Sequence, residues 1–333
     1  MFFLTATYAV LHFLVDFTCA CAMIGRFALG SAGYGYILIY NFSAFALQMP
    51  LGTLLDGTKR PDAPRLFALT GVICTFLGAF LHPALLGLGN ALFHVGGGVD
   101  VIREDCGKGL KGRALGVFVA PGAMGLFFGT LEARSTGFLL AAGAAAALFA
   151  RRLFRLRPPP VSCPSGSGGK DLWIPGICCF LVVALRSYVG MAVVFSWKTG
   201  FWLPFLAVCA VVLGKMAGGF AAARFGTKAT VLISLGLAGG CYLLCDAPVF
   251  GLAALFFFNM SMPVTLYQLW LRMPAMPGLA FGALTFALFL GFVPVYLGLP
   301  VPVSPGMLGA LGSAVSLGLL WPVCREVNAW TGC

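Results

Sequence analysis

Near the middle of the sequence stands the segment RRLFRLRPPPVSCPSGSGGK, residues 151–170. It is basic at its start and rich in Pro, Gly and Ser after that, a composition that is typical of a linker. Six apolar runs precede this segment and six follow it. The sequence therefore predicts two equal helical halves joined by a basic connection.

The apolar runs are continuous and are separated by Gly, Pro and charged residues. They cover residues 3–24, 33–55, 65–81, 84–102, 112–131, 136–150, 172–196, 201–223, 229–245, 247–271, 278–297 and 304–323. A membrane-spanning helix needs about 20 residues, so twelve spans use about 240 of the 333 residues. The remainder leaves no room for a folded domain outside the membrane. Continuous runs also exclude a transmembrane β-barrel, whose strands alternate in polarity.

The composition excludes several classes of protein. Hydrophobic residues make up 60% of the chain and charged residues 9%, whereas soluble domains carry about 25% charged residues. A soluble domain of this size would have to expose large apolar patches to water. We therefore exclude a soluble enzyme, a nucleic-acid-binding domain and a disordered chain, and we expect lipid to be the solvent.

The net charge of +11 fits the topology rule for membrane proteins. If the N-terminus is cytoplasmic and the spans alternate, the outer segments hold only Arg26, Arg134 and Lys198 as basic residues. We expect an inner-membrane protein with both termini cytoplasmic and an uncleaved first span. The predicted parts are a six-helix bundle over 1–150, a cytoplasmic linker over 151–171, a second six-helix bundle over 172–323 and a cytoplasmic tail over 324–333.

The two halves share a motif. The segment GTLLDGTKR follows the second run at residues 52–60, and GFAAARFGTK follows the eighth at 219–228. This pattern resembles the loop signature of the major facilitator superfamily, Gly-x-Leu-x-Asp-Arg-x-Gly-Arg, which recurs after spans two and eight. The first copy lacks the later Gly, and the second has Ala223 at the acidic position. The resemblance implies an all-α membrane protein with twelve transmembrane helices in two pseudo-symmetric six-helix bundles, working by alternating access.

Further segments are similar to the fosmidomycin-resistance branch of that superfamily, whose members are drug exporters. They are HFLVD at 12–16, GLGNALFH at 87–94 and the Pro/Gly-rich fifth run. The fifth run is also similar to a motif of proton-coupled antiporters, carried here by Pro121, Gly122, Gly125 and Gly129.

Glycines four residues apart lie on one helix face and allow a second helix to approach closely. Gly125 and Gly129 have this spacing in the fifth run, and Gly214 and Gly218 have it in the eighth. Two interpretations stay open, ordinary helix packing and a sliding contact between the halves.

In the superfamily, the acid of the first motif copy caps the N-terminal end of the eleventh span and pairs with basic residues when the inner gate is closed. The resemblance implies this role for Asp56, with the backbone at Gly278 and the side chain of Arg103 as candidate partners. The positive end of a helix dipole favours that placement. The alternative is a solvated ion pair in the loop, close to Arg60. The predicted gate residues are Gly52, Asp56, Arg60, Arg103, Gly219, Arg224, Gly226 and Lys228.

Polar residues inside the first and fourth runs predict a functional cluster. His12 and Asp16 are four residues apart, as are Asn90 and His94, so each pair shares one helix face. A carboxylate inside a membrane is costly and usually faces a partner or a cavity, and in the superfamily both spans line the central cavity. His and a buried carboxylate can take up and release protons. Two alternatives stay open, a structural hydrogen-bonded role and a site for a divalent metal ion.

Other polar residues inside the runs are weaker candidates for the cavity. Arg186 is the one basic residue deep in the seventh run. It is expected to pair with Asp16, to contact an anionic substrate or to form a structural pair. Single polar side chains more often form bonds between helices than line a cavity. Those considered are Asn41, Gln48, Asn259, Tyr267 and Gln268.

Together these features predict a secondary active transporter, a proton-coupled exporter of small organic molecules that acts as a monomer. The alternatives are a divalent metal-ion exporter and a non-transporting receptor or assembly factor. No catalytic constellation and no nucleotide motif is visible in the sequence, so we expect no enzyme activity, no cofactor and no bound structural metal. The expected partners are the small-molecule substrate, protons and the lipid bilayer, and no nucleic acid.

Overall fold

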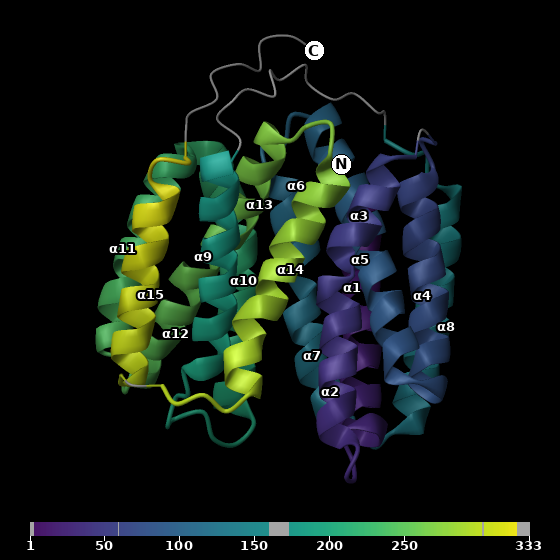
Figure 1. Ribbon diagram of the computed structural model, residues 1–333, viewed down its shortest axis with the longest axis horizontal. Coiled ribbons are helices and arrows are strands. Elements are labelled where there is room, and N and C mark those ends of the chain that lie inside the picture. Colours follow the sequence, from purple (N-terminus) through teal and green to yellow (C-terminus); the bar gives the residue numbers. More distant parts are fainter. Residues whose placement is uncertain (1–2, 59, 160–172, 302, 325–333) are drawn as a thin grey trace. The chain divides into compact units, whose positions relative to one another are not determined.

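The computed structural model describes residues 3–58, 60–159, 173–301 and 303–324, and Figure 1 shows that they form helices. No strand is present in these ranges. Most of the predicted linker, residues 160–171, and nearly all of the predicted tail, from residue 325 on, lie outside the described residues.

The first half of the chain contains eight α-helices and two π-helical turns. They are α1 (Phe3–Ala22), η1 (Met23–Phe27), α2 (Gly33–Asn41), η2 (Phe42–Ala46), α3 (Gln48–Asp56), α4 (Ala63–Leu81), α5 (Pro83–Gly107), α6 (Arg113–Val119), α7 (Pro121–Leu131) and α8 (Thr136–Arg155). Helix α8 ends at Arg155, so the first residues of the predicted linker are helical.

The second half contains seven described α-helices. They are α9 (Trp173–Ala192), α10 (Trp202–Phe225), α11 (Thr227–Leu243), α12 (Pro248–Asn259), α13 (Ser261–Arg272), α14 (Pro277–Tyr296) and α15 (Pro305–Leu320). Helix α15 begins after Ser304, whose hydroxyl accepts a hydrogen bond from the backbone N–H of Met307. Such a cap satisfies one of the backbone donors that a helix start leaves unpaired.

Each predicted apolar run corresponds to one helix or to one group of consecutive helices. Ten helical segments in the described part of the chain are long and apolar enough to cross a membrane, and α11 and α15 are shorter apolar helices. The second run is built from α2, η2 and α3, the fifth from α6 and α7, and the tenth from α12 and α13. The prediction of twelve spans agrees with this count.

Prolines explain the interruptions inside these three spans. Pro50, Pro121 and Pro263 lack the N–H group that a helix would direct at the carbonyl four residues earlier. In the second span the backbone changes to the wider π form before Pro50, and the Leu47 N–H bonds to the Phe42 carbonyl five residues back. The fifth span breaks at Ala120 and resumes with Pro121 at the start of α7.

The chain divides into two compact units. The first contains Met1–Gly107, Val117–Cys163 and Ala275–Phe286, and the second contains Lys108–Gly116, Pro164–Pro274 and Ala287–Cys333. The beginning of α14 therefore belongs to the first unit, although the sequence places it among the last spans. Within the first unit, the spans of α1 and α5 are the most enclosed, and they carry the polar residues that form the candidate site.

Candidate functional site

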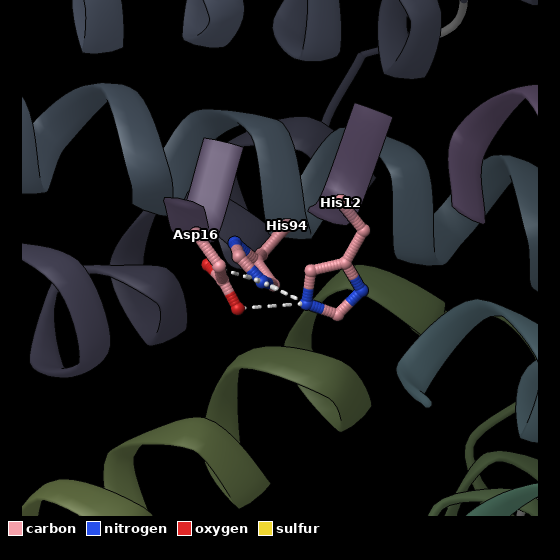
Figure 2. A group of neighbouring side chains, drawn as sticks. All are labelled: His12, Asp16 and His94. Carbon is pink, nitrogen blue, oxygen red and sulfur yellow. Dashed lines mark hydrogen bonds and ion pairs between the residues drawn. The ribbon is translucent and has the colours of Figure 1, made fainter. Parts of the chain in front are cut away.

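The four polar residues predicted from the first and fourth runs meet inside the first unit. His12 and Asp16 lie one turn apart on α1, and Asn90 and His94 lie one turn apart on α5. Figure 2 shows both imidazole rings directed at the Asp16 carboxylate. The His12 Nε2 atom lies 3.2 Å from Asp16 Oδ2 and 2.9 Å from His94 Nε2.

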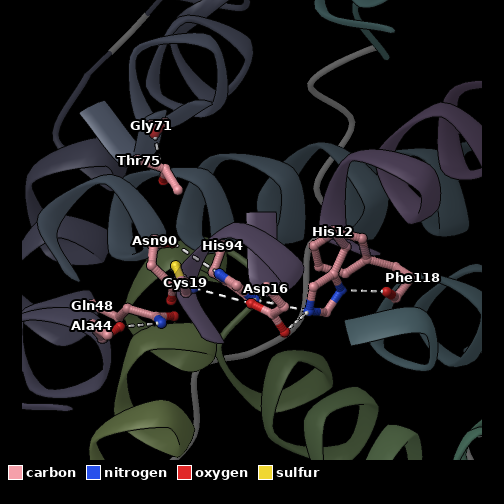
Figure 3. Close-up of polar contacts among 10 residues, drawn as sticks. All are labelled: His12, Asp16, Cys19, Ala44, Gln48, Gly71, Thr75, Asn90, His94 and Phe118. Atoms are coloured by element: carbon pink, nitrogen blue, oxygen red, sulfur yellow. Dashed lines mark hydrogen bonds and ion pairs between the residues drawn. The ribbon is translucent and has the colours of Figure 1, made fainter. Parts of the chain in front are cut away.

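Asn90 completes the cluster by holding the second carboxylate oxygen. Its amide nitrogen donates to Asp16 Oδ1 over 3.0 Å, as Figure 3 shows. Asp16 is 8% exposed and Asn90 2%. A carboxylate so far from water is stabilised only by hydrogen bonds and opposite charge, and here an amide and two imidazoles supply them.

The backbone contacts of the two histidines define where their protons sit. His12 Nδ1 lies 2.7 Å from the carbonyl oxygen of Phe118, and His94 Nδ1 lies 2.8 Å from that of Asn90. A carbonyl oxygen only accepts, so each Nδ1 carries the hydrogen, and each neutral ring presents a bare lone pair at Nε2. The two Nε2 atoms face each other, so their hydrogen bond requires one additional proton between the rings. A proton shared at this point would make the pair a cation beside the Asp16 carboxylate.

The walls around this cluster are aromatic and close. Phe93 and Phe118 are fully buried, and the His12 ring lies 5.1 Å from the Phe118 ring and 6.2 Å from the Phe93 ring. On a further side α7 comes so near that a Cβ atom on Gly122 would lie 2.3 Å from His12 Nε2 and 2.4 Å from Asp16 Oδ2. Any side chain at residue 122 would therefore displace the cluster.

The same two helices carry a second buried polar group that the sequence analysis missed. Tyr8, one turn before His12, donates its hydroxyl to Asp100 Oδ2 over 2.7 Å. Arg65 of α4 lies 3.7 Å from the same oxygen. One turn further along α5, Glu104 accepts hydrogen bonds from the backbone and hydroxyl of Thr5. An acidic residue inside the fourth apolar run is the signal that would have found Asp100.

Asp56 lies where the motif resemblance expected it. Its carboxylate accepts hydrogen bonds from the backbone N–H groups of Gly278 and Leu279, over 2.8 and 2.7 Å, at the start of α14. A carboxylate at this position satisfies backbone donors that have no partner within the helix, and it meets the positive end of the helix dipole. Gly52 makes the approach possible, because a Cβ atom there would lie 2.1 Å from the Gly278 carbonyl oxygen.

The basic residues around Asp56 have different partners from those expected. Arg60 is exposed and forms an ion pair with Asp62 at 2.9 Å, so the alternative of a loop ion pair between Arg60 and Asp56 is not seen. The hydrogen bonds from Arg60 hold the pKa of the Asp62 carboxyl below its usual value. Arg103 donates to the Pro61 carbonyl oxygen over 3.0 Å, which leaves the backbone of α14 as the hydrogen-bond partner of Asp56.

The second motif copy has the same close packing without the acid. In the second unit, a Cβ atom on Gly219 would lie 2.6 Å from the Gly112 carbonyl oxygen, immediately before α6. Gly226 joins α10 to α11 with φ +85°, a conformation that favours glycine. Arg224 and Lys228 are exposed, and the Lys228 ammonium lies 5.5 Å from the centre of the Trp321 ring.

The glycines of the antiporter-like helix pack within one unit. Cβ atoms on Gly125 and Gly129 would each lie 2.3 Å from a carbonyl oxygen of α1, those of Phe13 and Phe17. Gly214 and Gly218 meet carbonyls of Phe256 and Met260 in the same way, inside the second unit. The interpretation of these four residues as a sliding contact between the halves is wrong, and close helix packing explains their spacing.

The remaining candidates are dispersed. The side-chain amides of Asn41, Gln48 and Asn259 each donate to the carbonyl four residues earlier in the same span. Gln268 donates to Thr227 and accepts from Arg272, and its neighbour Tyr267 is buried. Arg186 lies in the second unit, 8% exposed, with its Nη1 atom buried and without a hydrogen bond. The structure thus brings together four of the predicted cavity residues in the first unit and shows the others in contacts within their own units.

The cluster also has the composition of a metal site. In the described part of the chain, His12, Asp16 and His94 form the one group of three or more ligating side chains whose ligand atoms lie close together, within 4.8 Å of one another. Two imidazoles and a carboxylate suit divalent transition metals.

Comparison with known proteins identifies the architecture. No profile of a known protein family matches the sequence, and no curated protein matches it. Among solved structures, the E. coli fucose:proton symporter FucP has 13% identity and a TM-score of 0.66, over 97% of this chain and 98% of its own. A FucP structure in the outward conformation, described as a major facilitator superfamily transporter, has 13% identity and a TM-score of 0.67, over 97% and 99%. The human organic anion transporter MFSD10 has 16% identity and a TM-score of 0.62, over 96% and 98%.

At these identities the likeness concerns the fold. The resemblance to the fosmidomycin-resistance branch stays a prediction, whereas the predicted all-α arrangement of twelve spans is confirmed. The chain has the fold of the major facilitator superfamily transporters.

Proposed function

We propose that this protein is a secondary active transporter that exchanges protons for a small organic solute, exporting the solute from the cytoplasm. It would work as a monomer in the cell's inner membrane, with both termini cytoplasmic and six spans on each side of the linker. The direction rests on the sequence resemblance to exporters. The fold supports transport at the level of architecture, because FucP and MFSD10, which share it, are described as transporters.

One observation carries the proton-coupled part of this proposal. His12 and His94 face each other through nitrogen atoms 2.9 Å apart whose opposite ring positions are already committed to backbone carbonyls. The pair therefore binds one proton, and Asp16 balances its charge. Histidine exchanges protons near neutral pH. When the proton leaves, two lone pairs and a carboxylate are left in contact, which is unfavourable and drives a rearrangement of α1 against α5. Protonation and conformation are coupled through this repulsion.

The experiment is transport in proteoliposomes with an imposed pH gradient. The Asp16→Asn variant keeps the shape and the hydrogen bond from Asn90 but removes the charge that balances the shared proton. We expect gradient-driven transport to fall to background, while solute exchange without a gradient persists. The matched control is Asp62→Asn, which removes an exposed carboxylate outside the site. If Asp16→Asn transported the solute at the parent rate under a gradient, the cluster would have no role in proton coupling. If protons drove uptake of the solute instead of its release, the proposed direction of export would be wrong.

A second candidate function is export of a divalent metal ion, favoured by the grouping of His12, Asp16 and His94. Metal binding would replace the shared proton, because both histidine Nε2 atoms and the carboxylate would then become ligands. Calorimetry on the purified protein with Mn²⁺, Fe²⁺, Co²⁺, Ni²⁺ and Zn²⁺ separates the two functions. Micromolar binding that is lost in His94→Gln would favour the metal. If none of these ions released or absorbed heat on titration at micromolar concentrations, metal-ion export would be excluded.

A further inference from the structure

The second unit contains a buried cation that has no ion pair among the residues that the structure describes. Arg186 lies on α9 in a stripe with Val182, Val183 and Val189, all of them buried. Its side chain is more than nine-tenths buried, and its Nη1 atom makes no hydrogen bond. In the described part of the second unit the one carboxylate side chain is that of Asp246, which is exposed in the turn after α11.

A second unpaired donor lies on the helix beside it. Ser316 of α15 is 1% exposed, and its hydroxyl makes no hydrogen bond. Helices α9 and α15 are in contact where a Cβ atom on Gly312 would lie 2.6 Å from Val189 Cγ2.

The direction of the two helices places these donors at one level. A Cβ atom on Gly176, near the start of α9, would lie 3.9 Å from Leu269 of α13. Arg272 of the same helix donates to the Val323 carbonyl just beyond the end of α15, so α9 and α15 run antiparallel. Arg186 is three residues before Val189, and Ser316 is four residues after Gly312. With a rise of about 1.5 Å per residue, both are displaced from the contact by about one turn in the same direction. Both belong to the buried stripes that contain the contact residues.

The chemistry of this pair matches an oxyanion. Arginine keeps its charge in proteins, and its planar fork of N–H groups fits the two oxygens of a carboxylate. The serine hydroxyl adds one further donor. A buried cation without a partner is strongly unfavourable, so this arrangement is stable in a membrane when an anion occupies it. The single positive charge of the guanidinium balances one negative charge, and the neutral hydroxyl adds only a donor, which favours a carboxylate over a doubly charged phosphate.

We propose that Arg186 and Ser316 bind the carboxylate of the transported solute, so that the substrate is an organic monoanion. This inference rests on the proposed transport function and names the class of its substrate. In it, the proton site on α1 and α5 and the anion site on α9 and α15 belong to different units.

The test is ligand binding by the purified full-length protein in detergent, where no gradient exists. The probes are benzoate and lactate, each beside its uncharged amide, with chloride and inorganic phosphate as further arms. We expect a carboxylate to raise the unfolding temperature and its amide to have no effect, because a ligand of the native state stabilises it. In Arg186→Gln the dissociation constant should rise at least tenfold. The dissociation constant of Arg186→Lys should lie between those of the parent protein and Arg186→Gln, because lysine keeps the positive charge but lacks the planar pair of N–H donors. Ser316→Ala should weaken binding severalfold.

The matched control is Lys198→Gln, which removes an exposed cation from the same unit and should bind as the parent protein does. Without ligand, Arg186→Gln should unfold at the same temperature as the parent or higher, since an unpaired buried charge is removed. The inference is overturned if acid and amide act alike, if neither carboxylate binds, if phosphate alone binds, or if Arg186→Gln unfolds at a markedly lower temperature. Binding without transport would instead contradict the proposed function and leave the anion site standing.

Discussion

The two units treat buried charge in opposite ways. In the first, each buried carboxylate group described above has a partner: Asp16 has the histidine pair, Asp100 has Tyr8 and Arg65, and Glu104 has Thr5. In the second unit, Arg186 is buried and the described residues offer it no hydrogen bond at Nη1. In the first unit a partner from the same unit faces each of these carboxylates, whereas in the second unit the described residues offer Arg186 no carboxylate nearby in the sequence or at its buried Nη1 atom. This difference separates proton handling from solute recognition in the proposed mechanism.

The largest effect that separates the units is expected from removing a buried cation in each. Arg65→Gln leaves Asp100 buried opposite a neutral group and should lower the free energy of unfolding by about 3–5 kcal/mol, because an uncompensated buried charge remains. Arg186→Gln should not lower the free energy of unfolding. Unfolding of both variants in the same detergent, followed by circular dichroism, gives the comparison directly. Equal losses in the two variants would mean that Arg186 has a structural partner and that the units do not differ.

A smaller effect is expected from filling the space that Gly122 leaves beside the histidine pair. Gly122→Ala places a methyl group 2.3 Å from His12 Nε2 and 2.4 Å from Asp16 Oδ2, and overpacking of this kind costs about 1–3 kcal/mol. Proton-driven transport should be lost with it. Gly236→Ala is the matched control, because a Cβ atom there has nothing within 4 Å. Replacing an exposed glycine inside a helix by alanine should raise the free energy of unfolding by about 0.5–1 kcal/mol. If both variants retained full transport, the close approach of α7 would have no role in proton coupling.

The smallest of these effects concerns the start of α14. Asp56→Ala removes the acceptor for two backbone N–H groups, and loss of such a cap costs about 0.5–2 kcal/mol. If Asp56 also closes the inner gate, as the motif resemblance implies, cysteine labelling of Asp56→Ala from the cytoplasmic side should be faster than labelling of the parent protein. Asp62→Ala should change neither the stability nor the labelling, since its ion pair with Arg60 is exposed. Unchanged labelling in Asp56→Ala would reduce its role to helix capping.

The sequence was most informative where one helix or one motif decides the outcome. The i,i+4 spacing in HFLVD and in GLGNALFH placed His12, Asp16, Asn90 and His94 on two faces, and these faces do meet. The contact of Asp56 with Gly278 followed from the motif resemblance.

Prediction failed where the outcome depends on which helix lies opposite. Nothing in the spacing of Gly125 and Gly129 says that α1, rather than the other half, fills the groove beside them. Arg60 and Asp62 are two residues apart, yet a loop has no fixed periodicity from which their pairing can be read. The pairing of Asp100 was not predicted because Tyr8, which donates a hydrogen bond to its carboxylate, looks in the sequence like an ordinary aromatic residue of an apolar run.

The position of residues 275–286 within the first unit has a consequence for biosynthesis. The cap between Asp56 and Gly278 joins residues that are 222 positions apart. During translation, the N-terminal spans must therefore wait in the bilayer until nearly the whole polypeptide has left the ribosome before that unit closes. A gene cut at the linker would yield an amino-terminal fragment that lacks one of its own structural pieces, so co-expressed halves should mature together or be degraded together.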